Sequence, residues 1–431
     1  MPSLKTTFSW LLLGKVFSLS GGLLSIALVN RALGPEARGI LAEMQTWVAM
    51  FAVLAGLSLD TAIYHLADRE RHKFDDIDFC SGVLQLSLLM SLVASLLMAI
   101  IFWGAAQYVS DQSREYYVAL AFLLVSTMVL ANLLTLVQAR GKVKLAALSS
   151  ATLGAFSALL AFGVYLQGHL TLHFAIFLLS TSNFVAIFVI LVDEWKQTRL
   201  FPFVPMNFFS KLISVGLKQH LATISTFLYM KVNQLILFNY VGAEKTGHYS
   251  VALNLAFSCG IIFGVLQSAL YPRVIHHKDD AEITIRIMRL MIYGGSIFTL
   301  MLIISSTVLI HIYAGSGYEE AVPLFCILIV GVSILSLSSM MAPLFIKHGA
   351  FTPMVFSAIA LGGASVLLNL YLVPRYHAVG AAYATTVTAI MGFCMVLYIF
   401  WRISRKSPMS VFMPRFKDEA IYIKQWLFDE K

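Results

Sequence analysis

The residues of this sequence that are most able to do chemistry are the few ionisable ones within its long apolar stretches. They are Lys15, Glu43, Asp60 and Lys231, with His220 near the start of one stretch. A charge at the centre of a bilayer is costly, so such residues usually face a protein interior or a water-filled cavity. The sequence therefore predicts that they pair with one another or meet a charged ligand or ion.

Lys231 lies near the middle of an apolar stretch, and the neighbouring stretches hold no acid of similar depth. A lysine so central cannot easily extend its ammonium group to the membrane surface. Asn233 and Gln234 add polarity at the same depth. These three residues predict a cavity that binds an anionic group of a substrate.

Lys15 and Asp60 are expected at similar depth on adjacent antiparallel helices, about 10 Å and 9 Å from the same membrane surface at 1.5 Å per residue. They can form an ion pair that merely neutralises two buried charges. Alternatively, a substrate phosphate or a proton competes for one partner. Glu43 is expected close to the opposite surface, as an interfacial carboxylate or, alternatively, as a proton-coupling group.

Uncharged polar residues within the apolar stretches have two interpretations, namely lining a cavity or forming hydrogen bonds between helices. They are Gln45, Gln85, Asn132, Asn183, Asn254 and Gln267.

The elements that must position these residues are membrane-spanning helices. Of the 431 residues, 59% are hydrophobic and 12% are charged, far from the balance of a soluble protein. A span needs roughly 20 apolar residues. About twelve spans are expected, near 8–29, 40–66, 79–104, 115–138, 145–166, 171–192, 218–240, 249–271, 290–313, 321–346, 353–373 and 380–402.

The distribution of basic residues predicts the orientation of these spans. If the N-terminus is cytoplasmic, the cytoplasmic segments hold 23 of the 30 Lys and Arg, and the outer loops hold five, including Arg31 and Arg38. Such an excess follows the positive-inside rule and favours both termini in the cytoplasm. The net charge of +8 therefore reflects topology and does not indicate a nucleic-acid partner.

An internal repeat divides the chain into two halves. Gly34, Glu36 and Gly39 recur as Gly242, Glu244 and Gly247, 208 residues further on. Each copy lies in the first helical hairpin of its half, where glycine suits a tight turn. Because six spans is an even number, the halves are expected to be parallel six-helix bundles related by a pseudo-twofold axis along the membrane normal, with a substrate cavity between them.

The expected domains are an N-terminal bundle (1–192), a cytoplasmic linker (193–217), a C-terminal bundle (218–402) and a cytoplasmic tail (403–431). The tail ends with Ile421, Ile423, Trp426 and Leu427, which suit a short interfacial helix or, equally well, a frayed terminus.

No catalytic, cofactor or metal motif is present. The sequence contains no GxSxG, HExxH, CxxC or GxGxxG, and its four cysteines lack the spacing of a metal site. An enzyme, a metalloprotein and an ATP-driven pump are therefore not expected. Any driving force is expected to be an ion gradient, the membrane potential or the substrate gradient.

Several motifs resemble the polysaccharide transporter family, which includes the O-antigen flippases and belongs to the multidrug/oligosaccharidyl-lipid/polysaccharide exporter superfamily. They are residues 30–39 (NRALGPEARG), 247–252 (GHYSVA), 271–273 (YPR) and 369–375 (NLYLVPR) followed by 380–385 (GAAYAT). The internal repeat and these motifs together give the expected structural turn residues, which are Gly34, Gly39, Gly242, Gly247, Pro272 and Pro374. One departure is Asn233, which stands where the family often has an acidic residue, so ion coupling at that position is not implied.

The resemblance implies a flippase that moves an oligosaccharide linked to undecaprenyl diphosphate from the inner to the outer leaflet of a bacterial inner membrane. It also allows proton or cation coupling and a glycan polymerase as a membrane partner. On this reading Lys15 and Lys231 bind the diphosphate, and Asp60 and Glu43 couple protonation or hold Lys15. The alternatives are an ion-coupled drug or metabolite antiporter of the same fold, a membrane glycan polymerase or acyltransferase, and a scaffold without transport.

Overall fold

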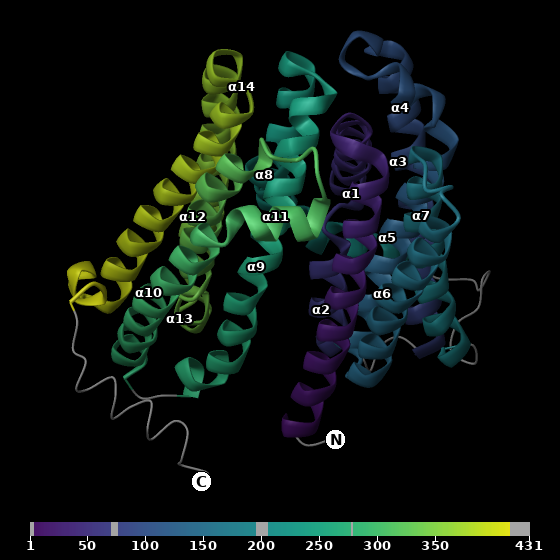
Figure 1. Ribbon diagram of the computed structural model, residues 1–431. Helices are drawn as coiled ribbons and strands as arrows, with labels where there is room; N and C mark the ends of the chain where they lie inside the picture. The colour runs from purple at the N-terminus through teal and green to yellow at the C-terminus, as the bar shows by residue number, and fades with distance from the viewer. Residues whose placement is uncertain (1–3, 70–75, 195–205, 277–278, 414–431) are drawn as a thin grey trace.

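The computed structural model describes residues 4–69, 76–194, 206–276 and 279–413, and nearly all of them are helical (Figure 1). In this described part, ten helices are long and apolar enough to cross a membrane. A helix bonds its own backbone N–H and C=O groups, which have no water to bond in lipid. The protein is therefore an all-α, multi-pass membrane protein, as its composition predicts.

The helices of the first half and those of the second half form two groups that stand side by side in Figure 1. The first group contains α1 (Leu4–Gly56), α2 (Leu59–Arg69), α3 (Asp76–Gly104), α4 (Asp111–Glu115), α5 (Tyr117–Ala139), α6 (Val143–Leu166) and α7 (Leu172–Asp193). The second contains α8 (Met206–Val241), α9 (Ala243–His276), α10 (Asp280–Ile304), α11 (Ser306–Ala314), α12 (Ala321–Ser339), α13 (Ala342–Lys347) and α14 (Phe351–Ser404).

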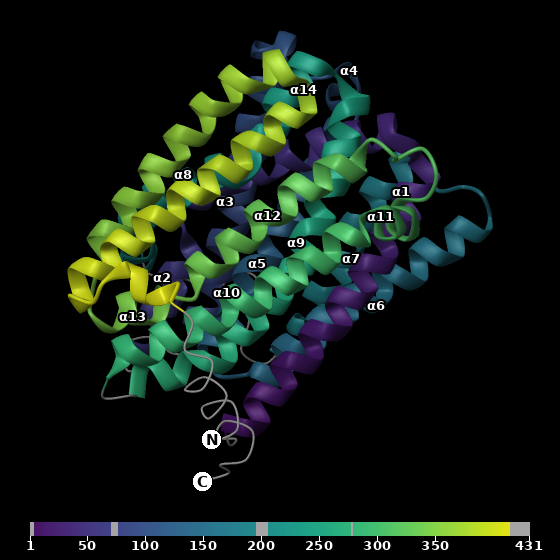
Figure 2. The same cartoon turned by 60° about the vertical axis from the view of Figure 1, so that its left-hand side comes forward.

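Two helices cross the membrane twice because each contains a sharp turn. α1 turns at Gly34, where φ is 71°, and α14 turns at His377, shortly after Pro374. The two arms of α14 run side by side (Figure 2), and Leu361 on one arm faces Gly392 on the other. With two passes for α1 and for α14, the ten apolar helices of the described part make twelve passes, which is the predicted number.

Each half has its own hydrophobic cores. Buried residues of α1, α3, α5 and α7 form the cores of the first half, and those of α9, α10, α12 and α14 form the cores of the second. α8 joins the two, because Phe208 and Leu212 at its beginning pack into the first half while Leu237 near its end packs into the second. α1 also contributes to the second half, because Leu23, Ile26 and Ala27 pack against its core.

Several boundaries differ from the predicted ones. α8 begins at Met206, so much of the segment assigned to the linker is helical. The second predicted span is interrupted at Leu57 and Ser58, both with positive φ. There the Ser58 hydroxyl bonds to Thr223 on α8 at 2.8 Å, an interhelical contact that hydropathy does not reveal. Pro272 was predicted to be a structural turn residue. Instead α9 continues past it to His276, so Pro272 marks no turn.

The two repeated hairpins contact each other reciprocally. A Cβ atom at Gly39 would lie 1.8 Å from the Ala243 carbonyl oxygen, and a Cβ at Gly247 would lie 1.8 Å from the Pro35 carbonyl oxygen. Pro35 and Ala243 occupy equivalent places in the repeat, as do Gly39 and Gly247. Such exchanged contacts are what a twofold axis between equivalent helices produces. The repeat therefore places its small residues where the halves approach most closely, at what we call the hairpin end.

Replacing Gly247 by alanine is expected to destabilise the protein, because its Cβ would overlap the backbone of Pro35 and force the hairpins apart. The matched control is Gly363→Ala on α14, where a new Cβ meets nothing within 4 Å and alanine favours a helix by about 0.5–1 kcal/mol over glycine. Thermal unfolding of the purified variants should show a lower midpoint for Gly247→Ala and an equal or higher one for Gly363→Ala. Equal midpoints would contradict the close contact.

The first part of the tail folds back onto the second half. After α14, the 3-10 turn η3 (Pro408–Val411) is held by Arg289, whose Nε donates to the Ser410 carbonyl at 2.8 Å. Lys406 also bonds to Glu282 at 3.2 Å. The interfacial helix predicted near 421–427 lies outside the described residues, and so do residues 195–205 of the linker.

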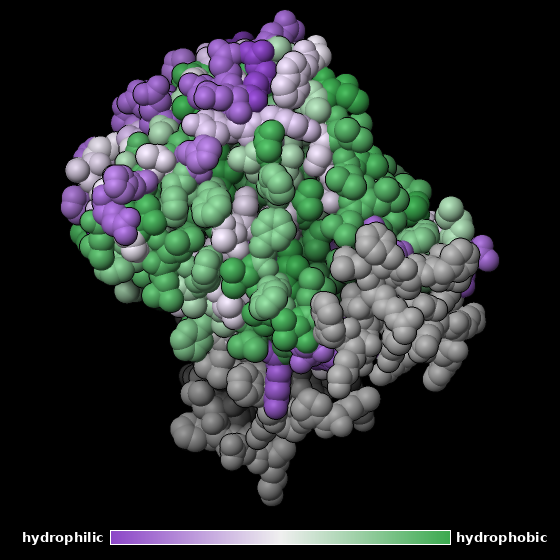
Figure 3. All heavy atoms as spheres, turned by 90° about the vertical axis from the view of Figure 1, so that its right-hand side faces the viewer, coloured by the Kyte–Doolittle hydropathy of each residue, from purple (hydrophilic) through white to green (hydrophobic). Residues whose placement is uncertain are grey.

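The outer surface fits a hydrocarbon environment. Figure 3 shows hydrophobic side chains gathered in a broad belt below a more hydrophilic rim. Large exposed apolar residues elsewhere, such as Leu159, Phe188 and Leu367, face outward as lipid-facing side chains do.

Candidate functional site

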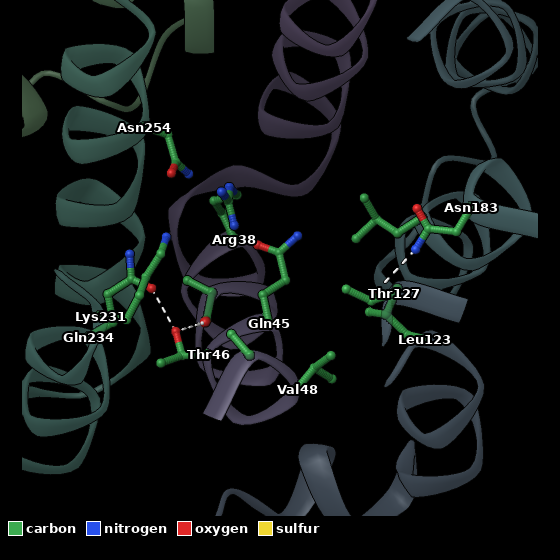
Figure 4. Close-up of a pocket in the computed structure, with 13 residues that line it drawn as sticks. Arg38, Gln45, Thr46, Val48, Leu123, Thr127, Asn183, Lys231, Gln234 and Asn254 are labelled. Atoms are coloured by element: carbon green, nitrogen blue, oxygen red, sulfur yellow. Dashed lines mark hydrogen bonds between the residues drawn. The ribbon is translucent and has the colours of Figure 1, made fainter. Parts of the chain in front are cut away.

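A cavity of about 330 Å³ lies between the two halves. α1, α5 and α7 of the first half supply one wall, and α8 and α9 supply the other (Figure 4). The polar residues that line it are Arg38, Gln45, Thr46, Thr127, Asn183, Lys231, Gln234 and Asn254. The cavity therefore lies where the repeat predicts a substrate site.

Two cations, Arg38 and Lys231, line this cavity from opposite walls (Figure 4). Arg38 is only 3% exposed; its Nε donates to Asn30 Oδ1 at 2.8 Å, while its buried Nη1 has no hydrogen-bond partner among the described atoms. Lys231 forms no ion pair with a described acidic residue. Since lysine and arginine offer only donors, both side chains are prepared to bind an anion.

The rest of the polar lining can bind neutral groups. Gln45 on α1, Asn183 on α7 and Asn254 on α9 present side-chain amides to the space (Figure 4). Asn183 also donates to Ser126 and Thr127, at 3.2 and 3.1 Å. The sequence left open whether its buried amides line a cavity or form hydrogen bonds between helices. Gln45, Asn183 and Asn254 line the cavity, whereas Asn132 on α5 donates to Ser87 on α3. Amides beside cations suit a ligand with hydroxyl groups as well as negative charge.

Gln234 connects the two walls. Its side-chain oxygen is 2.7 Å from the Thr46 hydroxyl, which is also 2.7 Å from the Ala42 carbonyl oxygen. A hydroxyl has one proton, so both contacts are satisfied when the Gln234 amide is turned and its NH₂ donates to Thr46. Gln234 therefore lines the cavity and also holds α8 against α1.

Asn233 does not line the cavity, which corrects its predicted role in substrate binding. Its side chain is fully buried within the second half, where Nδ2 donates to the Tyr249 hydroxyl at 2.6 Å and to Thr385 Oγ1 at 3.0 Å. Successive helix residues point about 100° apart, so Lys231 and Gln234 share a face that Asn233 does not. Asn233 joins α8, α9 and α14.

Glu43 is buried within the protein near the hairpin end. It is 0% exposed, and its oxygens accept hydrogen bonds from Trp47 Nε1 at 3.0 Å and from the Ser110 N–H at 3.1 Å. The Ser110 and Ser113 hydroxyls donate as well. These serines belong to the segment around α4 at the hairpin end, so Glu43 attaches that segment to α1. Glu43 does not line the cavity.

Asp60 and Lys15 are not brought into the cavity by any described contact. Asp60 lies in the first turn of α2 and is exposed. Lys15 belongs to α1, but its side chain lies outside the described part of the chain, so its pairing with Asp60 stays a prediction.

Arg38 is the site residue that the sequence interpretation missed, because it was assigned to an outer loop. In the structure, α1 resumes directly after the turn at Gly34, so Arg38 stands in the first turn of the second arm and points inward. A signal was present in the sequence: Pro35 after Gly34 is typical of the first position of a helix.

A family model described as polysaccharide biosynthesis protein matches residues 4–277. No curated protein sequence matches the chain.

Solved structures of similar fold cover nearly the whole chain. The lipid II flippase MurJ in an inward closed conformation has a TM-score of 0.77 at 12% identity, over 98% of this chain and 93% of that one. An inward-facing multidrug resistance MATE family transporter of the MOP superfamily has a TM-score of 0.65 at 14% identity, over 91% of this chain and 96% of that one. A MOP superfamily transporter from Pyrococcus furiosus Vc1, whose binding pocket is described as having reverse polarity, has a TM-score of 0.60 at 15% identity, over 93% and 95%. These likenesses show a shared fold.

Proposed function

The chain belongs to the polysaccharide biosynthesis protein family, and on this basis we propose that it is a flippase for an oligosaccharide linked to undecaprenyl diphosphate. The substrate is a repeat unit of O-antigen, capsule or exopolysaccharide. The direction is from the inner to the outer leaflet of a bacterial inner membrane. The similarity of the fold to a lipid II flippase supports the class of transport.

The observation that carries this proposal is the charge of the cavity between the halves. Arg38 and Lys231 line it, and its described lining contains no acidic residue. A diphosphate is an anion with several acceptor oxygens, and guanidinium and ammonium groups bind such oxygens by charge-assisted hydrogen bonds. The amides of Gln45, Asn183 and Asn254 are placed to bind sugar hydroxyls beside it.

Transport by alternating access fits the way the halves are built. Most of the buried apolar residues in each core come from one half, so in this proposal each half moves largely as a rigid body around a site between them. The reciprocal contact of Gly39 and Gly247 closes the hairpin end, and the bond of Ser58 to Thr223 connects the break between α1 and α2 to α8, further from that end. Opening one of these contacts while the other holds would expose the cavity to one side at a time.

The second candidate is an ion-coupled drug or metabolite antiporter, which the likeness to MATE transporters favours at the level of fold. It requires carboxylates in the binding region, because cationic drugs need negative partners. Asp60 is exposed, and Glu43 is occupied by hydrogen bonds to Ser110 and Ser113 outside the cavity lining. The flippase is therefore the better supported function, and coupling to protons or cations and a partner glycan polymerase remain part of the proposal.

The test is complementation of a bacterial strain that lacks its own oligosaccharide-lipid flippase. Wild-type protein is expected to restore surface glycan for one glycan type in a panel, with membrane levels checked by blot. The control is a proteoliposome assay in which the same lipid-linked glycan becomes accessible to an external glycosidase only when the protein is present. Failure across the panel together with no movement in proteoliposomes would refute the proposal.

A further inference from the structure

A second cavity, of about 620 Å³, lies wholly within the second half. α8, α9, α12, α13 and both arms of α14 line it. Tyr229, Phe257, Phe345, Ala358 and Val396 are among the lining residues, and none of the described residues around it is charged.

The serine and threonine hydroxyl groups in this second cavity are already bonded to the backbone of their own helices. Ser336 donates to the Val332 carbonyl at 2.8 Å, and Ser357 donates to the Pro353 carbonyl at 2.8 Å. The other hydroxyls of Ser and Thr in the lining do the same, with partners Ala222, Ile334 and Ser336 for Thr226, Ser338 and Ser339. Because their protons are used, the cavity presents an almost purely apolar surface, which suits hydrocarbon.

The apolar cavity and the cationic cavity share two walls. On α8, Lys231 and Gln234 line the cationic cavity, while Tyr229 and Met230 line the apolar one. Met230 directly precedes Lys231, so on α8 the apolar residues lie on the side of Lys231 that is further from the hairpin end. On α9, which begins at the hairpin end, Phe257 of the apolar cavity follows Asn254 of the cationic cavity by about one turn and is therefore also further from that end.

We propose that the apolar cavity holds the polyprenyl chain of the substrate while the cationic cavity holds its diphosphate. This inference rests on the proposed function. A single molecule with an anionic head beside a long hydrocarbon chain would fill both cavities along the seam between α8 and α9. The competing occupant is an acyl chain of a membrane phospholipid, which the experiment separates from the polyprenyl chain.

The test compares two identical substitutions on one arm of α14. Ala358→Trp fills the apolar cavity, whereas Ala360→Trp places the same side chain on the exposed face of the same helix. Affinities are measured for undecaprenyl diphosphate without sugar, for inorganic pyrophosphate and for phosphatidylglycerol, with thermal unfolding recorded for each variant. Ala358→Leu, a smaller filler, replaces the tryptophan variant if that variant does not fold.

Ala358→Trp is expected to weaken undecaprenyl diphosphate binding about tenfold or more through lost packing of the chain, and to leave pyrophosphate and phosphatidylglycerol binding unchanged. Ala360→Trp should change none of the three. Unchanged undecaprenyl diphosphate binding in Ala358→Trp overturns the inference, and so does an equal loss of phosphatidylglycerol binding. The proposed function fails separately, if Lys231→Ala binds both diphosphates as wild type does.

Discussion

Lys231→Ala is expected to abolish restoration of surface glycan and to weaken diphosphate binding by about 10- to 150-fold. The range corresponds to about 1.5–3 kcal/mol for a hydrogen bond to a charged group. Lys231 lines the cavity and forms no ion pair with a described acid. Its removal therefore takes away a ligand contact without leaving a buried carboxylate unpaired.

The control for this prediction is Lys218→Ala, the same substitution on an exposed residue of the same helix. Lys231→Arg retains the positive charge and should retain much of the activity. Binding of inorganic pyrophosphate to purified protein, measured by calorimetry, gives the affinities. If Lys231→Ala transports normally while Asp60→Asn is inactive, the cationic site is wrong and the antiporter becomes the better interpretation.

Arg38→Ala extends this prediction to the other wall. If both cations bind one diphosphate, the double variant should lose less than the product of the two single losses, because contacts that share one ligand are not independent. Fully independent losses would indicate that Arg38 and Lys231 bind different groups.

The features that could be predicted from the sequence are those that a single physical constraint decides. Hydropathy predicted twelve passes because lipid forces the backbone of every span into a helix. The repeat predicted the two hairpins, since Gly34 and Gly242 are required for positive φ. Lys231 was identified as a cavity residue because its charge lies too deep to reach water and has no acid nearby.

The residues that sequence reasoning misplaced are those whose surroundings depend on the direction of one side chain. Asn233 and Gln234 are neighbours in the chain, yet one points into the second half and the other into the cavity. Arg38 was predicted to lie in an outer loop because hydropathy places the start of the second span near residue 40, whereas the helix resumes directly after Gly34. The apolar cavity could not be foreseen, because its residues have the same composition as the lipid-facing surface.

Glu43→Gln is expected to lower the stability of the folded protein by about 2–4 kcal/mol, the second large effect. The carboxylate accepts hydrogen bonds from Trp47, Ser110 and Ser113. An amide oxygen can still accept from the Trp47 and Ser110 N–H groups, but its NH₂ then faces the two serine hydroxyls, which must turn to accept. The bonds also lose their charge assistance, so the total loss is about 2–4 kcal/mol. The segment around α4 should then detach from α1.

The measurement is thermal unfolding of the purified variant, with Glu36→Gln as the control, since Glu36 lies on the same helix but is exposed. Ser113→Ala should reproduce part of the loss, because its hydroxyl donates to the same carboxylate at 3.1 Å. The alternative role of Glu43, proton coupling, makes the opposite prediction. If Glu43→Gln unfolds at the wild-type temperature but no longer transports, Glu43 couples transport to protonation, and the hydrogen bonds to Ser110 and Ser113 report one state of that cycle.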